Sequence, residues 1–430
     1  MGVFQIPEYL RFWLGLIILV YLVLSLLLRS RRPWIPVWCV MAFSSFMTIV
    51  FGLVSFDEVG VVIDMDVILF LIGMFSLVGL AESSGLLNVI AAVFISMFKR
   101  TVALACGASI LFGLLAAFTV NDTIALIGPP IAYSISRVTR MDPKMMFLLL
   151  AFSLTIGSVM TPIGNPQNIL IAVESGIEAP FLKFITKLTI PTLTNLVLTT
   201  YILLKKYKVK NDNLSMSLIP HEALKNRRDA ILAGVGISLT VIALIINDLL
   251  QMYGEPHITY RGVIPFVVAA GTYLLTSNPR KTLSGVDWGT IIFFITMFIT
   301  MEGVWRSGIL KPILNIVMPS KTNGLVGILR ITVISILLSQ LLSNVPFVKL
   351  FINYMKDLGY TNLDYEAWIA LAMSSTIAGN LTLLGAASNI IVLETLESKM
   401  KTTITFMEFL KVGTITTLAN CIVYLIFLII

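Results

Sequence analysis

The sequence predicts an all-α membrane protein with many spans, built from two inverted repeats, and three observations lead to this class. The 430 residues are 57% hydrophobic and only 12% charged, with a mean hydropathy of +0.94, whereas soluble proteins carry about 25% charged residues. Runs of about 20 apolar residues, long enough to cross a bilayer as helices, recur along the chain. Two of these runs are interrupted by similar polar motifs at corresponding places.

The first interrupted run contains residues 155–168, with the sequence TIGSVMTPIGNPQN. Proline removes a backbone donor and glycine weakens a helix, so this stretch predicts a break. Unwound backbone at bilayer depth survives only where it is buried in protein or lines a cavity. Broken helices with polar residues at the break form the midplane binding sites of secondary transporters.

The second interrupted run contains residues 376–389, with the sequence TIAGNLTLLGAASN. Subtracting 221 carries Asn389 to Asn168 and Thr382 to Thr161. The alternative interpretation is that each polar break merely kinks a packed helix. Two aligned breaks favour a binding site between two related halves.

Five crossings in each half, hairpins excluded, predict about ten transmembrane helices. The expected spans are 9–29, 34–54, 66–82, 143–175, 184–204, 229–250, 260–277, 288–303, 366–398 and 408–430. An odd number of crossings inverts the second half, and the basic loops then all fall on one side. We therefore expect repeats at 1–204 and 229–430, with broken helices at 143–175 and 366–398, a cytoplasmic basic linker at 205–228 and extracytoplasmic termini.

Each half also contains a predicted re-entrant hairpin. Residues 102–137 are apolar except at Asn121-Asp122-Thr123, and both flanks are basic, so the segment should enter, turn at these three residues and leave. Two full spans with this triplet in an outer loop are the alternative, although the second arm is short for a span. Adding 223 carries Asn121 to Asn344, inside a second predicted hairpin at 324–355. Residues 85–98 predict a helix along the cytoplasmic face.

Asp122 is the most informative candidate residue, because a carboxylate at bilayer depth is functional by default. It would bind Na⁺ when ionised or take up a proton when buried, and it would repel a di- or tricarboxylate unless a cation sits between them. An ordinary hairpin cap is the alternative. The candidate substrate- and ion-binding residues at the tips and breaks are Asn121, Asp122, Thr123, Thr161, Gly164, Asn165, Asn168, Ser343, Asn344, Thr382, Gly385, Ser388 and Asn389.

Oxygen ligands suit a hard cation such as Na⁺. The expected Na⁺ ligands among the candidates are Asn121, Asp122, Asn165, Asn344 and Asn389. Asn168 and Asn389 have a second interpretation, as helix caps. No cofactor is expected beyond H⁺ or Na⁺ as the coupling ion.

The sequence contains no HExxH, GxSxG, CxxC or phosphate-binding glycine-rich motif, so an enzyme or an ATP-driven pump is not expected. The three cysteines are scattered through apolar segments without metal-ligand spacing. The net charge of +7 arises from short basic loops, which set topology and do not indicate nucleic acid.

This arrangement resembles the ion transporter superfamily, which includes citrate transporters, divalent anion–sodium symporters, arsenite efflux permeases and sodium–proton antiporters. The resemblance lies in Asn121-Asp122-Thr123, in residues 164–168 (GNPQN), in Ser343-Asn344-Val345-Pro346 and in residues 385–389 (GAASN). It implies an elevator mechanism, in which the hairpins and broken helices move against a scaffold, often in a homodimer. The Asn-Asp tip looks more like the arsenite permease branch than the dicarboxylate branch.

The expected function is secondary active transport of the arsenite-efflux type, coupled to protons or to the membrane potential. Na⁺/H⁺ antiport and Na⁺- or H⁺-coupled di- or tricarboxylate symport are alternatives within this class, and a passive channel is the alternative from another class. The expected partners are a small inorganic or carboxylate solute, the lipid bilayer and a second copy of the chain. The expected location is the plasma or inner membrane.

Overall fold

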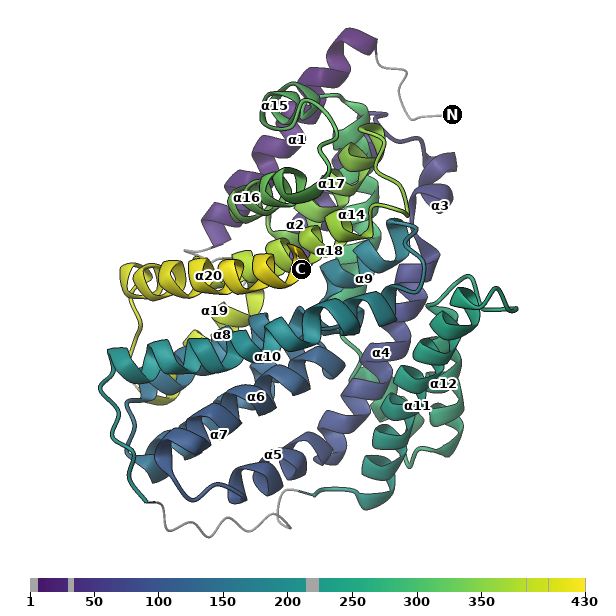
Figure 1. Cartoon of the computed structure of the whole chain (residues 1–430). Coiled ribbons are helices and arrows are strands. Elements are labelled where there is room, and N and C mark those ends of the chain that lie inside the picture. The colour runs from purple at the N-terminus through teal and green to yellow at the C-terminus, as the bar shows by residue number, and fades with distance from the viewer. Residues whose placement is uncertain (1–6, 30–34, 214–223, 384, 401, 430) are drawn as a thin grey trace.

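A computed structural model describes residues 7–29, 35–213, 224–383, 385–400 and 402–429 (Figure 1). All the secondary-structure elements in the described part of the chain are helices, which confirms the predicted all-α class. The first helices are α1 (Glu8–Arg29), α2 (Val37–Val50), α3 (Val59–Val62), α4 (Met65–Ser84), α5 (Leu86–Ser96), α6 (Thr101–Thr119), α7 (Asn121–Thr139), α8 (Pro143–Ser158), α9 (Pro166–Glu174) and α10 (Pro180–Lys206).

The remaining helices follow the linker. They are α11 (Arg227–Met252), α12 (Val263–Leu275), α13 (Pro279–Ser284), α14 (Trp288–Arg306), α15 (Lys311–Val317), α16 (Gly324–Leu342), α17 (Asn344–Asp357), α18 (Tyr365–Ile377), α19 (Ala387–Met400) and α20 (Phe406–Ile429). Short 3-10 turns occur at Phe56–Glu58, Pro162–Gly164 and Ala378–Asn380.

Helix α8 and helix α18 form the centre of the molecule. Every residue from Met145 to Ser158 in α8 is buried, and so is every residue from Ala367 to Ile377 in α18. A helix that is apolar on all sides must be surrounded by other helices. Helices α6, α7, α10 and α19 pack on α8, while α16 and α20 pack on α18. The two broken runs of the sequence therefore begin in the two central helices.

The outer helices form layers around this centre (Figure 1). Helices α11 and α12 pack along α4, and α1 and α2 pack with α14. The long helices α10 and α20 lie side by side. Asp64 and Asp287, which the offset of 223 relates, cap the N-termini of α4 and α14: Asp64 accepts from the backbone N–H of Asp66 and Asp287 from that of Thr290. Both carboxylates thus have a structural task at helix starts.

The expectation of about ten transmembrane helices is supported in part by the lengths and compositions of the helices. Among the described residues, seven helices are long and apolar enough to cross a membrane: α4, α6, α10, α11, α14, α16 and α20. Two of these seven, α6 and α16, are the first arms of the predicted hairpins. Shorter apolar stretches, of 10–17 residues, lie in α2, α5, α8 and α12, while α1 is 22 residues long and is apolar over Tyr9–Ser25. The central helix α8 is short because Pro162 and Pro166 follow it at the break.

Two further boundaries differ from expectation. The second arm of the first hairpin is longer than the apolar run indicates, since α7 begins at Asn121, keeps Pro129 and Pro130 inside the helix and ends at Thr139. The linker expected at 205–228 is shorter, since α10 continues to Lys206 and α11 begins at Arg227. Part of that linker, residues 214–223, lies outside the described residues.

Helices α6 and α8 cross at a pair of glycines. A β-carbon on Gly157 would collide with the Cα and carbonyl oxygen of Gly113, which are backbone atoms that cannot turn aside. Small residues at such crossings let helix backbones approach closely in a membrane. This crossing holds the first hairpin against the first broken helix.

Gly157→Ala should therefore destabilise the protein by about 1–3 kcal/mol, the usual cost of overpacking. Thermal unfolding of the purified protein in detergent would measure the change. Gly271→Ala is the matched control, because nothing lies within 4 Å of its added β-carbon and replacing glycine inside a helix gains about 0.5–1 kcal/mol. Equal melting temperatures for the two variants would contradict the close crossing.

Candidate functional site

Both hairpins turn at a single residue in the same rare backbone conformation. Val120 joins α6 to α7 with φ 67° and ψ 129°, and Ser343 joins α16 to α17 with φ 68° and ψ 156°. Residues other than glycine seldom adopt positive φ, and such a conformation costs about 1–3 kcal/mol. The offset that carries Asn121 to Asn344 also carries Val120 to Ser343, so the two turns correspond.

The position of the first turn corrects the sequence expectation. Asn121, Asp122 and Thr123 do not form the turn, because they are the first three residues of α7. In the second hairpin Asn344 likewise begins α17. Asparagine, aspartate and threonine are favoured near helix N-termini, where free N–H groups and the helix dipole create a positive end. Both hairpins therefore present a helix N-terminus at the tip.

The carboxamides at the two tips are buried, and their oxygens have no partner. Asn121 and Asn344 are each 8% exposed. Neither Oδ1 atom accepts a hydrogen bond from the part of the chain that the structure describes. A buried acceptor without a partner costs about 1–3 kcal/mol, so each such group calls for an explanation. The explanation that the sequence suggests is a bound ion or solute.

Asp122 and Thr123 are half-buried, whereas Ser343 is exposed. No hydrogen bond from a described residue to the Asp122 carboxylate is present. Its corresponding residue in the second hairpin is Val345, so the carboxylate belongs to one hairpin alone.

The first break is held against the first hairpin by Thr161. Its hydroxyl donates to the carbonyl oxygen of Ala117 in α6 and accepts from the backbone N–H of Gly164 at 3.1 Å. A β-carbon on Gly164 would collide with the Ser158 backbone, so this position of the tight turn requires glycine. Asn165 then caps α9, accepting from the Asn168 N–H at 2.9 Å.

The second break is held against the second hairpin in a related way. The Thr382 hydroxyl donates to Gln340 Oε1 of α16 at 2.7 Å, and Gln340 Nε2 donates to the Ala378 carbonyl at 2.8 Å. The offset of 223 between the hairpins relates Gln340 to Ala117. The threonine hydroxyl therefore donates to a side-chain amide oxygen in the second half, where it donates to a backbone carbonyl in the first. Each hairpin is thus fastened to its own break one helical turn before its tip.

Asn168 and Asn389 make matching hydrogen bonds. Asn168 Nδ2 donates to the carbonyl oxygens of Ser158 at 3.0 Å and Thr161 at 3.2 Å. Asn389 Nδ2 donates to those of Gly379 at 2.7 Å and Thr382 at 3.4 Å, and the offset of 221 relates all three pairs of residues. Three of these carbonyls also accept from a second donor: Ser158 from Asn165 Nδ2, and Thr161 and Thr382 from the backbone N–H groups of Gly164 and Gly385. Both carboxamides therefore add donors to backbone carbonyls at the breaks.

Thr376 joins the two breaks to each other. Its hydroxyl donates to Asn168 Oδ1 at 3.2 Å and accepts from Asn165 Nδ2 at 3.1 Å. Buried groups without a described partner remain on the second break, namely Asn389 Oδ1, Ser388 Oγ and both polar atoms of Asn380. Gly385 packs closely against the backbone of Gly379 in the same turn.

The structure thus gathers the predicted residues into two hairpin–break units that Thr376 links. Among the described residues no hydrogen bond joins one hairpin tip to the other. Of the predicted Na⁺ ligands, Asn165 differs from the others, because its Oδ1 already caps α9. The remaining four, Asn121, Asp122, Asn344 and Asn389, keep side-chain oxygens with no described hydrogen-bond partner, and Na⁺ binding there stays a prediction.

Three residues of this region were missed by the sequence reasoning: Gln340, Thr376 and Asn380. Thr376 and Gln340 are polar residues in apolar runs, which is a usable signal. The offset of 221 pairs Asn380 with Val159, so the alignment of the two halves gave no reason to select it.

A buried ion pair fastens the second hairpin to the first broken helix. Lys349 of α17 donates to both Glu174 oxygens of α9, at 2.6 and 2.7 Å, and the two side chains are only 11% and 7% exposed. The offsets relate Lys349 to Leu126 and Glu174 to Thr395, so the first hairpin has no equivalent pair.

Comparison with known proteins agrees with this fold. The chain is 27% identical over 404 residues to the silicon efflux transporter LSI3 of Oryza sativa subsp. japonica, covering 81% of this chain and 82% of the relative. It is 28% identical over 300 residues to the inner membrane protein YbiR of Escherichia coli K12, covering 68% and 72%. The crystal structure of the Alcanivorax borkumensis YdaH transporter has a similar fold, with a TM-score of 0.56, 14% identity and 84% of each chain covered.

The apolar helices, the broken central pair and these likenesses define a multi-pass membrane transporter and not an enzyme. A model of the citrate transporter family matches residues 16–369. The chain belongs to that family, within the ion transporter superfamily, as the sequence motifs predicted.

Asn168→Ala and Asn121→Ala should separate structural from solute-binding carboxamides. Asn168→Ala removes the hydrogen bonds that its side chain makes to the Ser158 and Thr161 carbonyls and to the Thr376 hydroxyl, so it should cost about 1–3 kcal/mol or more of stability. Asn121→Ala removes an oxygen that has no described partner, so the melting temperature of the solute-free protein should stay within about one degree. A similar loss of stability in both variants, measured by thermal unfolding, would contradict this division.

The Lys349–Glu174 pair should behave as a coupled unit. Lys349→Met alone leaves a buried carboxylate without its partner and should cost about 3–5 kcal/mol. The double variant Lys349→Met/Glu174→Leu should recover most of that loss, because both charges are gone. Additive losses in this double-mutant cycle would show that the pair does not interact.

Proposed function

We propose that the protein is a secondary active transporter that exports a small, neutral hydroxylated metalloid of the arsenous or silicic acid type. The observation that carries this proposal is the set of buried carboxamide oxygens at the hairpin tips and second break that have no described partner. Amides and hydroxyls of this kind bind a neutral polyhydroxy solute by hydrogen bonds. The rice relative is named a silicon efflux transporter, which supports the same solute class.

The charge of the site also favours a neutral solute. The four segments that form the tips and breaks, residues 117–123, 155–168, 340–346 and 376–389, contain no lysine or arginine. A di- or tricarboxylate would meet Asp122 with no basic residue in these segments to offset the repulsion. The family's description as citrate transporters keeps carboxylate symport as the competing proposal.

Asp122 is the proposed site of coupling to protons. A half-buried carboxylate with no hydrogen bond from a described residue can hold a proton or a cation in exchange for the solute. Na⁺/H⁺ antiport uses the same residue, with Na⁺ bound among the carboxamide oxygens. Coupling to the membrane potential alone would leave Asp122 without this role.

The transport mechanism that we infer is alternating access by two inverted repeats. Its support is the recurrence, at the two offsets that align the halves, of the positive-φ tips and of the Asn168 and Asn389 contacts. Val120 is 1% exposed and Asn121 8%, which favours re-entrant hairpins over tips in outer loops. A pair of oppositely directed hairpins is better suited to alternating access than to a passive channel.

In this proposal the hairpins and the broken helices move as one elevator body, and the outer helices serve as the scaffold of a homodimer. We place the protein in the plasma or inner membrane, with the linker between α10 and α11 in the cytoplasm and both termini outside. The exposed lysines 205, 206 and 208 at the end of α10 support this orientation.

Asp122→Asn tests the proposal in liposomes that contain the purified protein and an internal pH dye. Arsenous acid, silicic acid, Na⁺ and citrate are added separately. We expect a metalloid to evoke a proton flux in the wild-type protein and Asp122→Asn to abolish it, because a carboxamide does not titrate. Asp142→Asn is the matched control: Asp142 caps α8 outside the site, and asparagine is an equally good cap.

Each other outcome selects an alternative. A flux evoked by Na⁺ alone would move the protein to Na⁺/H⁺ antiport. A response to citrate alone, unchanged in Asp122→Asn, would replace our proposal with carboxylate symport. A solute flux that does not saturate as the concentration rises, with no accumulation of solute against a gradient, would indicate a channel.

A further inference from the structure

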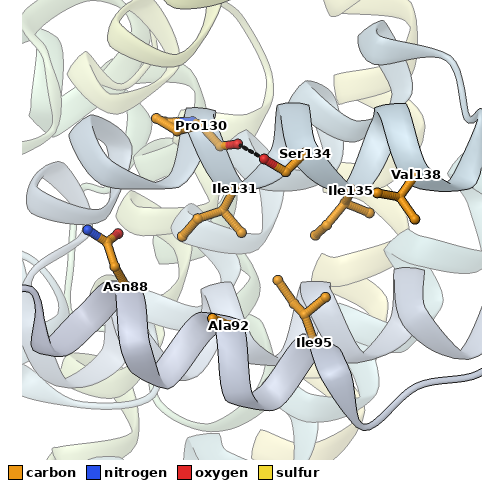
Figure 2. Close-up of a pocket in the computed structure, with 8 residues that line it drawn as sticks. All are labelled: Asn88, Ala92, Ile95, Pro130, Ile131, Ser134, Ile135 and Val138. Carbon is orange, nitrogen blue, oxygen red and sulfur yellow. Dashed lines mark hydrogen bonds between the residues drawn. The ribbon is translucent and has the colours of Figure 1, made fainter. Parts of the chain in front are cut away.

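An apolar slot lies between α5 and α7, away from the tips and breaks (Figure 2). Its volume is about 170 Å³. The residues that line it are Asn88, Ala92 and Ile95 from α5, and Pro130, Ile131, Ser134, Ile135 and Val138 from α7. Along α5 the lining runs from residue 88 to residue 95, a length of about 10 Å at 1.5 Å per residue.

Six of the eight lining residues are apolar, and the carboxamide of Asn88 lies at the end away from Ile95 and Val138, so the rest of the slot suits hydrocarbon better than water (Figure 2). The Ser134 hydroxyl donates to the Pro130 carbonyl of its own helix at 2.9 Å, so it offers little to a bound polar group (Figure 2). A comparable apolar cavity of about 150 Å³ stays dry and binds benzene. Pro130, Ser134 and Val138 are exposed, so the slot is open at the α7 edge. In a bilayer the hydrocarbon at this edge is lipid.

One end of the slot is basic. Helices α5 and α7 both end near Ile95 and Val138, and α6 begins at the same end of the hairpin. The cations gathered there are Lys99, Arg100, Arg137 and Arg140, and all four are exposed. The acidic residues of the neighbouring loops are Asp142, which caps α8, and Asp212, which follows Lys208 and Lys210. Cations therefore outnumber acids where the slot ends.

We propose that this slot binds one anionic phospholipid, with an acyl chain between α5 and α7 and the phosphate at Lys99, Arg100, Arg137 and Arg140. Basic residues at a membrane surface attract anionic headgroups, and the apolar lining next to them takes the chain. The combination of a dry slot and a basic end selects a phospholipid over a free phosphate, which would leave the slot empty. This inference does not depend on which solute the protein transports.

The site has a consequence for the transport cycle proposed above. Helix α7 is an arm of the first hairpin, and α5 is the helix expected to lie along the cytoplasmic face. A lipid between them fills the space that the hairpin leaves beside α5. Movement of the hairpin against α5 would change the shape of the slot, so anionic lipid should favour the state in which the slot is formed.

The test is lipid retention by the purified full-length protein, measured by native mass spectrometry after detergent washing. Dioleoyl phosphatidylglycerol and dioleoyl phosphatidylcholine, which share their acyl chains, are added in turn. We expect about one tightly held phosphatidylglycerol per chain. Ala92→Phe fills the slot and should remove this lipid, whereas Val93→Phe, on the exposed side of α5, is the matched control and should retain it.

A second variant tests the headgroup without altering the slot. Arg137→Gln/Arg140→Gln should lower the preference for phosphatidylglycerol over phosphatidylcholine by about fivefold for each arginine removed, and Arg137→Lys/Arg140→Lys should restore it. Equal retention by Ala92→Phe and Val93→Phe would overturn the slot as the lipid site. Equal retention of the two lipids by the wild-type protein would overturn the headgroup assignment. Neither result bears on the solute transport assay, because retention is measured without transport.

Discussion

The structure depends on satisfying the backbone carbonyls of two helices that are broken inside an apolar core. Both breaks are buried in protein, where a carbonyl needs a hydrogen-bond donor. Asn168 and Asn389 each give the side-chain amide to two carbonyls of their own break, and the backbone N–H groups of Gly164 and Gly385 also donate there. Without this arrangement the tight turns after α8 and α18 could not remain buried, and the hairpins packed against them would lose their support.

The same contacts separate residues that build the site from residues left free within it. Asn165 and Asn168 use their polar atoms within the breaks and on Thr376. Asn121 and Asn344 do not hold a break in this way, and their side-chain oxygens have no described hydrogen-bond partner. The carboxamides that looked equivalent in the sequence therefore fall into two groups, one that holds the breaks and one that can meet a solute.

The two halves are alike in backbone and different in charge. Val120 and Ser343 share a rare conformation, and each break is tied to its hairpin by a threonine. The differences are the carboxylate of Asp122 in the first hairpin and the buried Lys349–Glu174 pair on the second. In the alternating-access mechanism that we propose, one site has two different entrances, so these unequal features are where direction and coupling would be decided.

The sequence by itself determined the all-α class, the membrane environment, the family and the offsets between the halves, because apolar run length and repeated polar motifs are local signals. It placed the first broken helix at 143–175, and α8 and α9 together occupy Pro143–Glu174. It placed the hairpin turn one residue too late, since polar residues mark a helix start as readily as a turn.

Only the tertiary structure decided which polar side-chain atoms of the site have a hydrogen-bond partner among the described residues and which do not. Three contacts show this: Thr376 bridges the two breaks, Gln340 takes the place of a backbone carbonyl, and Lys349 binds Glu174. The residues in these contacts are 38 to 211 positions apart in the chain. Such contacts leave no periodicity or motif in the chain, because they arise only when the helices pack.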